Sequence, residues 1–90
     1  MTQEPKYDFR DGRVINRATG EAIPLDEPVM VFRGRDRHAA EALLAYMKLL
    51  ENPKHIHAVS LRLADFGAFA VNHPERMKEP DTEPWWESQP

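Results

Sequence analysis

The 90-residue sequence contains no cysteine and only four glycines, and no apolar run reaches the roughly 18 residues that a membrane-spanning helix needs. Without cysteine, neither disulfide bonds nor thiolate metal sites can form, and a reducing compartment is the simplest location. The first six residues also lack the apolar stretch of a signal peptide. We therefore expect a cytoplasmic protein with no membrane attachment.

A strong excess of one charge is also absent. Twelve Lys and Arg residues stand against 15 Asp and Glu residues, for a net charge of −3. This balance excludes a general nucleic-acid binder and is too weak for a nucleic-acid mimic. The charge is uneven, however: residues 28–63 contain six basic and three acidic residues, and residues 74–90 contain two basic and five acidic ones. The positive middle leaves room for one local anion pocket.

The sequence has few residues suited to catalysis or metal binding. Hydroxyl side chains are scarce, none stands in a nucleophile-elbow or triad-like setting, and no glycine-rich phosphate loop is present. His55 and His57 would diverge on a helix, while His38 and His73 are isolated, so a site with three or four ligands is not expected. We expect a protein that is not an enzyme and has no catalytic residues, cofactor or metal.

The first third of the chain predicts short strands and turns. Asp11-Gly12 favours a tight hairpin turn, and a second turn is expected at residues 17–20; the sequence leaves open whether one or both hairpins form. Residues 29–33, Val-Met-Val-Phe-Arg, form the strongest strand candidate because they are apolar and rich in β-branched residues.

Two helices are expected in the second half. Asp36 is a plausible N-cap for a helix over about residues 37–51. Asn52 and Pro53 form a restart signal, with Asn as N-cap and Pro at the first helical position, for a second helix to about Asn72. Each helix carries an apolar stripe at three- and four-residue steps: Ala40, Leu43, Leu44, Met47 and Leu50 on the first, and Ile56, Val59, Leu63, Phe66 and Ala70 on the second.

These elements predict an α+β fold. A small antiparallel sheet of two or three strands would pack on an antiparallel helical hairpin, forming one domain over residues 1–73, with an extended, acidic, proline-broken tail over residues 74–90. Leu61 and Phe69 fall off the main stripe, and a second copy of the chain would bury them. A core this small often gains stability by association, so we expect a homodimer or higher homo-oligomer.

The candidate binding residues lie between the last strand candidate and the first helix. Arg33, Arg35, Arg37 and His38 fall within six residues, at a helix start that attracts anions, and arginine suits phosphate or carboxylate. Asp36 would compete for that helix start. In the alternative interpretation, the arginines pair with nearby carboxylates on a solvated surface: Asp8, Asp11, Asp26 or Glu41.

Aromatic residues are candidates for a lid over such a ligand. Tyr46 on the first helix and Trp85 in the tail are both suited to stack on a ring. The adjacent Trp85 and Trp86 would otherwise fold back over this chain or a sister subunit, or anchor the tail on a partner.

Several segments resemble a family of short, largely uncharacterised proteins of tailed phages and prophages. The resemblance is carried by Thr-Gly-Glu-Ala-Ile-Pro at residues 19–24, Asp-Glu-Pro-Val at 26–29, Phe32-Arg33 with Asp36, and the run His-Pro-Glu-Arg-Met-Lys-Glu-Pro-Asp-Thr at 73–82. It covers roughly residues 12–82 and brings no catalytic or cofactor residue. It implies a phage setting, in which small proteins act against host defence by blocking a defence protein or by sequestering a nucleotide-derived signal.

The leading hypothesis is therefore a phage-type, counter-defence binding protein that sequesters an anionic, nucleotide-like small molecule in the host cytoplasm. One alternative is a protein-interaction module that inhibits a host defence protein through its Trp-Trp tail. Another is a virion or assembly accessory protein.

Overall fold

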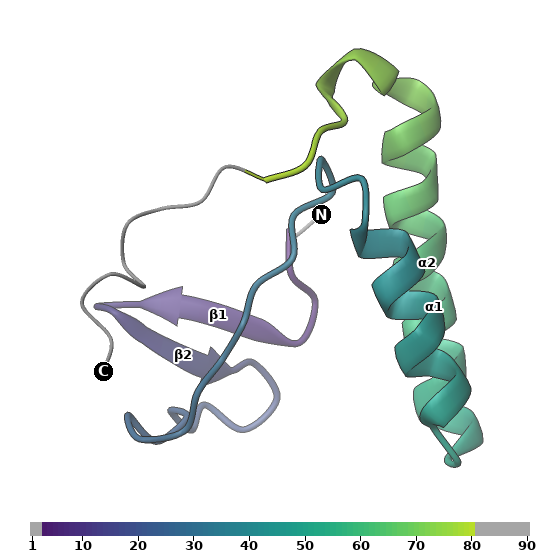
Figure 1. Cartoon of the computed structure of the whole chain (residues 1–90). Coiled ribbons are helices and arrows are strands. Elements are labelled where there is room, and N and C mark those ends of the chain that lie inside the picture. Colours follow the sequence, from purple (N-terminus) through teal and green to yellow (C-terminus); the bar gives the residue numbers. More distant parts are fainter. Residues whose placement is uncertain (1–2, 81–90) are drawn as a thin grey trace, which may run out of the picture. The chain divides into compact units, whose positions relative to one another are not determined.

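The structure, a computed structural model, describes residues 3–80. The chain divides into two compact units, and the division falls between Val31 and Phe32. The first unit contains a two-stranded antiparallel sheet and the second contains two packed helices (Figure 1). These elements confirm the predicted α+β class. Among the described residues, no helix is long and apolar enough to cross a membrane.

The sheet is a hairpin closed by the Asp-Gly turn. Strand β1 (Tyr7–Arg10) pairs antiparallel with β2 (Arg13–Asn16). Asp11 and Gly12 have φ angles of 50° and 74°, as a two-residue type I′ turn requires at both of its central positions. The predicted first hairpin is therefore confirmed.

The second predicted hairpin also forms, as a shorter structure on the other edge of β2. The Gly20 amide donates to the Asn16 carbonyl at 2.8 Å, and Ile15 forms an isolated antiparallel bridge with Ala22. The Asn16 side chain stabilises the turn because its Oδ1 accepts from the Ala18 and Thr19 amides at 2.9 and 3.3 Å. Both early hairpins are thus present.

The strongest strand candidate is not a strand. Residues 29–33 belong to no sheet, and the only sheet among residues 3–80 is the β1–β2 pair. The prediction was wrong because β-branched composition makes a segment suitable for a pleated surface but does not supply the neighbouring strand on which a ladder depends.

Helix α1 runs over Ala39–Leu49, so it is shorter at both ends than the predicted residues 37–51. Asp36 is not its N-cap: that position belongs to His38, which makes no side-chain capping bond. Asp36 acts one turn earlier, where its Oδ1 accepts from the His38 amide at 2.8 Å and its carbonyl accepts from the Ala39 amide at 3.1 Å. The carboxylate therefore fixes the turn that precedes the helix.

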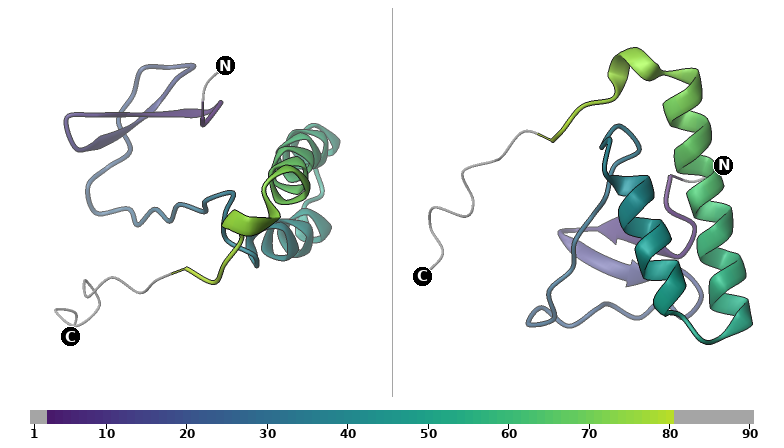
Figure 2. Two further views of the ribbon diagram at one scale, coloured as in Figure 1. Left: turned by 90° about the horizontal axis from the view of Figure 1, so that it is seen from above. Right: turned by 45° about the vertical axis from the view of Figure 1, so that its right-hand side comes forward.

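Helix α2 runs over Pro53–Asn72 and begins as the sequence predicts. The Asn52 side chain accepts from the Lys54 amide at 2.9 Å, and Pro53 takes the first helical position. Only residues 50–52 separate the helices, so α1 and α2 are antiparallel neighbours, which lie side by side in the views of Figure 2.

The helical core is thin. All five stripe residues of α2 are half-buried, and so are those of α1 except Leu44, which is exposed. Ala39, at the start of α1, is the only fully buried hydrophobic residue among those described. Leu61 remains 55% exposed, as predicted for a residue off the stripe.

Replacing the α2 cap tests how far this thin core depends on local signals. We expect Asn52→Ala to lower the free energy of unfolding by about 1 kcal/mol, because the Lys54 amide loses its acceptor. Urea unfolding followed by circular dichroism measures the change. Asn52→Asp, which keeps an acceptor, is the control; equal losses in the two variants would contradict a capping role.

The carboxylate of Asp8 on β1 provides a pH test of the hairpin. The Arg10 Nε donates to Asp8 Oδ2 at 2.6 Å, and this bond, together with the Phe9 amide and the charges of Arg10 and Arg17, lowers the pKa of Asp8. A lowered pKa in the folded state means that the interaction stabilises the hairpin at neutral pH. That contribution is lost as the pH falls through the folded-state pKa.

We expect an NMR titration of the Asp8 carboxyl carbon to give a midpoint below the ordinary aspartate value. Arg10→Gln should raise this midpoint, because it removes the charged donor. Lys6→Gln is the charge-matched control and should leave the midpoint nearly unchanged. If the Asp8 midpoint were the same in the wild type and in Arg10→Gln, the ion pair would be absent in solution.

Candidate anion-binding site

The chain reverses direction at the end of α2. His73 closes the helix, with its amide donating to the Phe69 carbonyl at 2.9 Å. The 3₁₀ helix η1 (Pro74–Arg76) follows at once, with the Arg76 amide donating to the His73 carbonyl at 3.0 Å. Residues 74–79 of the predicted extended tail are therefore folded onto the helical unit, and residues 81–90 lie outside the described part.

This reversal brings residues 77–79 alongside the arginine segment. Asp36 and Lys78 form a parallel bridge, in which the Arg37 amide donates to the Lys78 carbonyl and the Lys78 amide donates to the Arg35 carbonyl, both at 3.0 Å. Asp36 is the single bridge residue of its segment, with turns before and after it. The bridge sets Arg37 beside Glu79, and their side chains form an ion pair.

Phe69 fastens this arrangement to α2. A Cβ atom at Gly34 would lie 3.4 Å from two carbons of the Phe69 ring, so the glycine lets the loop run directly over the aromatic side chain. The His73 ring centroid is 4.9 Å from that of Phe69, and the Arg76 guanidinium lies 4.8 Å from the same ring. Phe69 is thus half-buried within its own chain, and cover of the rest of its surface by a second copy stays a prediction.

The bridge gives the arginines an internal anion. Arg37 Nη2 lies 2.9 Å from Glu79 Oε2, and His38 Nε2 lies 3.8 Å from the same oxygen. The Arg37 Nε also donates to His38 Nε2 at 3.3 Å, so the two side chains are held together. Two of the four predicted basic residues thus converge on a single carboxylate oxygen.

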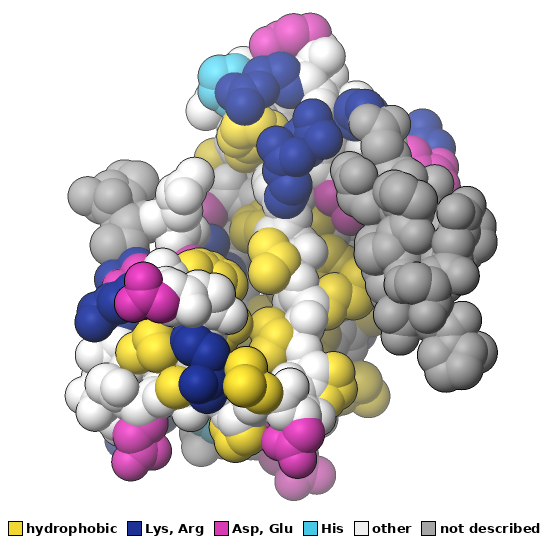
Figure 3. All heavy atoms as spheres, turned by 90° about the vertical axis from the view of Figure 1, so that its left-hand side faces the viewer, with side chains coloured by type: hydrophobic (Ala, Val, Ile, Leu, Met, Phe, Trp, Pro, Cys, Tyr) yellow, Lys and Arg dark blue, Asp and Glu magenta, His cyan; other side chains and the backbone are white. Residues whose placement is uncertain are grey.

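Within the described residues, Arg33 and Arg35 at this end form no ion pair of the kind that Arg37 forms. Residues 33–38 and 73–79 contain five Arg and Lys residues against three carboxylates, and in Figure 3 basic side chains gather around a histidine at the upper end of one face. Within residues 3–80, neither Arg33 nor Arg35 has a carboxylate within 4.0 Å. In the same region, none of the arginines pairs with Asp11, Asp26 or Glu41, and Asp8 is held by Arg10 and Arg17.

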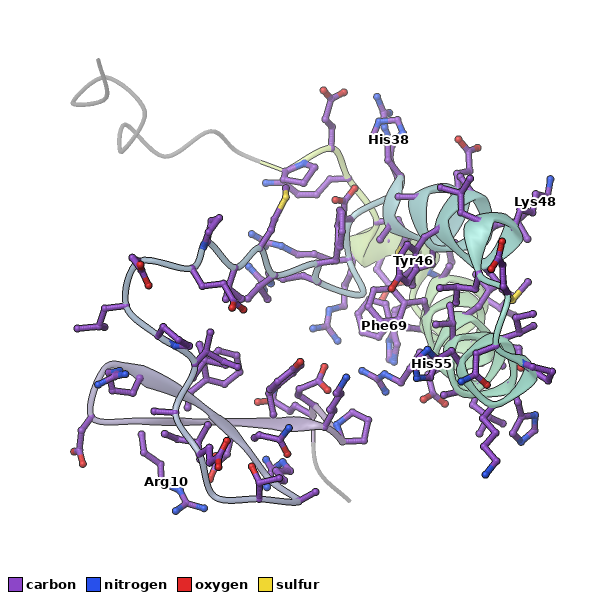
Figure 4. All side chains as sticks on the ribbon, turned by 90° about the horizontal axis from the view of Figure 1, so that it is seen from below. Arg10, His38, Tyr46, Lys48, His55 and Phe69 are labelled. Carbon is purple, nitrogen blue, oxygen red and sulfur yellow. The ribbon has the colours of Figure 1, made fainter. Side chains whose placement is uncertain are left out.

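The predicted aromatic lid is not assembled in the described part. Tyr46 lies on α1, 53% exposed, eight residues after His38 and so about 12 Å further along the helix axis. His38 projects outward at the start of the same helix (Figure 4). Trp85 lies outside the described residues.

Four residues of this end were not predicted as site residues: Phe69, Arg76, Lys78 and Glu79. The signal for the last three was the dense run His-Pro-Glu-Arg-Met-Lys-Glu at residues 73–79, where a proline directly after a helix can begin a 3₁₀ turn instead of a tail. The described residues include no group of three or more His, Asp or Glu side chains that could hold a metal ion.

Neither a protein-family model nor a curated protein or solved structure matches the chain. The bridge, the Phe69 contacts and the Glu79 ion pair therefore carry the functional interpretation.

Removing the Phe69 ring tests whether it holds the site together. We expect Phe69→Ala to speed hydrogen exchange at the Arg37 and Lys78 amides by at least about fivefold, the factor that corresponds to the roughly 1 kcal/mol of one cation–π contact. Leu61→Ala, on the exposed side of the same helix, is the control. Unchanged exchange at both amides would mean that the bridge forms without the aromatic contact.

Proposed function

We propose that the chain is a non-enzymatic binding protein that holds an anionic, nucleotide-like small molecule on Arg35, Arg37 and His38. The observation that carries the proposal is the Glu79 carboxylate, which Arg37 and His38 share at 2.9 and 3.8 Å. A phosphate oxygen placed there would meet the Arg37 guanidinium, with the His38 ring beside it. Arginine binds phosphate and carboxylate through the same planar fork of N–H groups.

Glu79 is a weak occupant that a stronger anion can replace. Its side chain is 66% exposed and that of Arg37 is 56% exposed, and ion pairs this open contribute only about 0–1 kcal/mol. A phosphate carries more charge and more acceptor oxygens than a carboxylate. Arg35, two residues before Arg37 and with no carboxylate within 4.0 Å among residues 3–80, supplies a second guanidinium for a neighbouring phosphate.

The start of α1 itself is not the proposed binding element. Asp36 already accepts from the His38 amide at 2.8 Å and, through its carbonyl, from the Ala39 amide. An anion at that helix terminus would have to displace the carboxylate that fixes the turn. Side-chain cations, and not the helix terminus, are therefore the recognition groups.

Binding without turnover suits a sequestering role. The phage-type and counter-defence setting rests on the family resemblance, and the preference for a nucleotide over other polyanions rests on the chemistry of the arginines. A module that inhibits a host defence protein through Trp85 and Trp86 would depend on residues 81–90, outside the described part, and no contact of the described residues favours it or a virion role.

Isothermal titration at low salt with cyclic and linear nucleotides, inorganic pyrophosphate and citrate tests the proposal. We expect Arg35→Ala to weaken nucleotide binding about tenfold, because a charge-assisted hydrogen bond contributes about 1.5–3 kcal/mol. Glu79→Gln should tighten binding, because it removes the internal competitor but keeps the side-chain shape.

Two matched variants make this result specific. Lys48→Ala removes a positive charge from the last turn of α1, and Glu75→Gln removes a negative charge from η1 beside His73. Both should change binding far less than the site variants. Absence of nucleotide binding at micromolar concentrations, or equal effects of Glu79→Gln and Glu75→Gln, would refute the proposed site. If pyrophosphate and citrate bound more tightly than nucleotides, the proposed site would be a general anion site and not a nucleotide site.

A further inference from the structure

Residues 29–32 form an apolar run with open backbone. Val29, Met30, Val31 and Phe32 are 52%, 80%, 63% and 41% exposed. Within residues 3–80, no hydrogen bond engages their N–H or C=O groups. The run passes without helix or turn from the first unit to the second (Figure 1). A segment whose composition favours strands and whose backbone groups are unpaired is a template for pairing with another strand.

The residues that flank this run make it complementary to itself. Asp26 and Glu27 precede it and Arg33 follows it, so one end is acidic and the other is basic. When two identical strands pair antiparallel, the acidic end of each copy meets the basic end of the other. An isologous contact of this kind closes as a dimer.

We propose that residues 27–33 pair antiparallel with the same residues of a second copy, with Met30 opposite Met30. In this register Val29 lies opposite Val31 and Glu27 lies opposite Arg33, and the two-fold axis makes each pair twice. Cross-strand β-branched pairs and opposite charges are the contacts that stabilise a ladder, at about 0.2–1 kcal/mol each.

Proline and the existing hydrogen bonds select this register. Pro28 has no N–H, and it falls opposite Phe32 at a position of the same non-hydrogen-bonded kind as the Met30 pair. Val29 and Val31 then exchange both of their backbone bonds. The Glu27 amide already donates to the Pro24 carbonyl at 3.1 Å, and the Arg33 carbonyl accepts from the Asp36 amide at 3.0 Å.

The Glu27 C=O and the Arg33 N–H therefore remain open. The Met30-centred register sets them opposite each other, so that Arg33 can donate to Glu27 across the two strands. If the same strand edge paired around Val31 instead, Val29 would lie opposite Arg33. The Val29 N–H would then need the Arg33 carbonyl as its acceptor, and that carbonyl already accepts from the Asp36 amide. The Met30-centred pairing therefore satisfies more of the open backbone.

A single cysteine tests the centre of the pairing, because the chain has none of its own. Residues opposite each other at a non-hydrogen-bonded position have Cα atoms about 4.5 Å apart, within the range of about 4.4–6.8 Å that a disulfide spans. We expect Met30→Cys to form a disulfide-linked dimer under mild oxidation. Val31→Cys, whose counterpart faces Val29, should cross-link at least about tenfold more slowly because its Cα atoms exceed that range.

Charge reversal tests the ends of the pairing without altering the apolar run. Glu27→Arg and Arg33→Glu should each weaken the dimer about tenfold in sedimentation equilibrium, because two symmetry-related pairs become repulsive. The double variant restores opposite charges and should recover the wild-type dissociation constant. Glu27 is not among the candidate anion-binding residues, so nucleotide binding by Glu27→Arg reports separately on that proposal, whereas Arg33→Glu is used in the dimer assay alone.

Three results would overturn the inference. They are a wild-type chain that stays monomeric at all concentrations, equal cross-linking through positions 30 and 31, and a double charge reversal that remains as dissociated as the single variants. All four positions are solvent-exposed, so the variants leave the interior of each unit intact.

Discussion

The parallel bridge between Asp36 and Lys78 is the interaction on which the candidate site depends. It joins two segments about 40 residues apart in sequence through a pair of backbone hydrogen bonds of 3.0 Å. The bridge is what sets Glu79 beside Arg37 and His38. Because two hydrogen bonds alone hold extended backbone weakly, the Phe69 ring beneath Gly34 and Arg76 supplies the apolar contact that the bridge needs.

The two units rely on local chemistry more than on a deep core. In the hairpin unit, Asp11 and Gly12 set the first turn and the Asn16 side chain sets the second. In the helical unit, Asn52 caps α2, and the stripes of both helices are only half-buried. A small domain buries a limited share of its surface, so caps and turns make up a larger part of its stability than they would in a larger protein.

These local signals explain which features the sequence predicts. The Asp-Gly turn, the Asn-Pro helix start and the two apolar stripes each involve neighbours a few residues apart, and all are present. The strand expected at residues 29–33 failed because it required a distant partner. The start of α1 shifted because Asp36 accepts from the turn before the helix. Arg35, Arg37 and His38 were identified from their density in the sequence, but Glu79 was not, since only the reversal after α2 brings it to them.

The Glu79 pair also bears on the proposed anion site when no ligand is bound. The Arg37 guanidinium is not an unpaired charge, because a carboxylate of its own chain lies 2.9 Å away. In the proposed site, ligand entry would exchange Glu79 for another anion, and ligand departure would restore the Arg37–Glu79 pair. Selectivity in such an exchange depends on how much more strongly the incoming anion interacts with Arg37 than Glu79 does. Under this proposal, the internal pairing of Arg37 reduces the attraction of the arginine segment for unrelated polyanions.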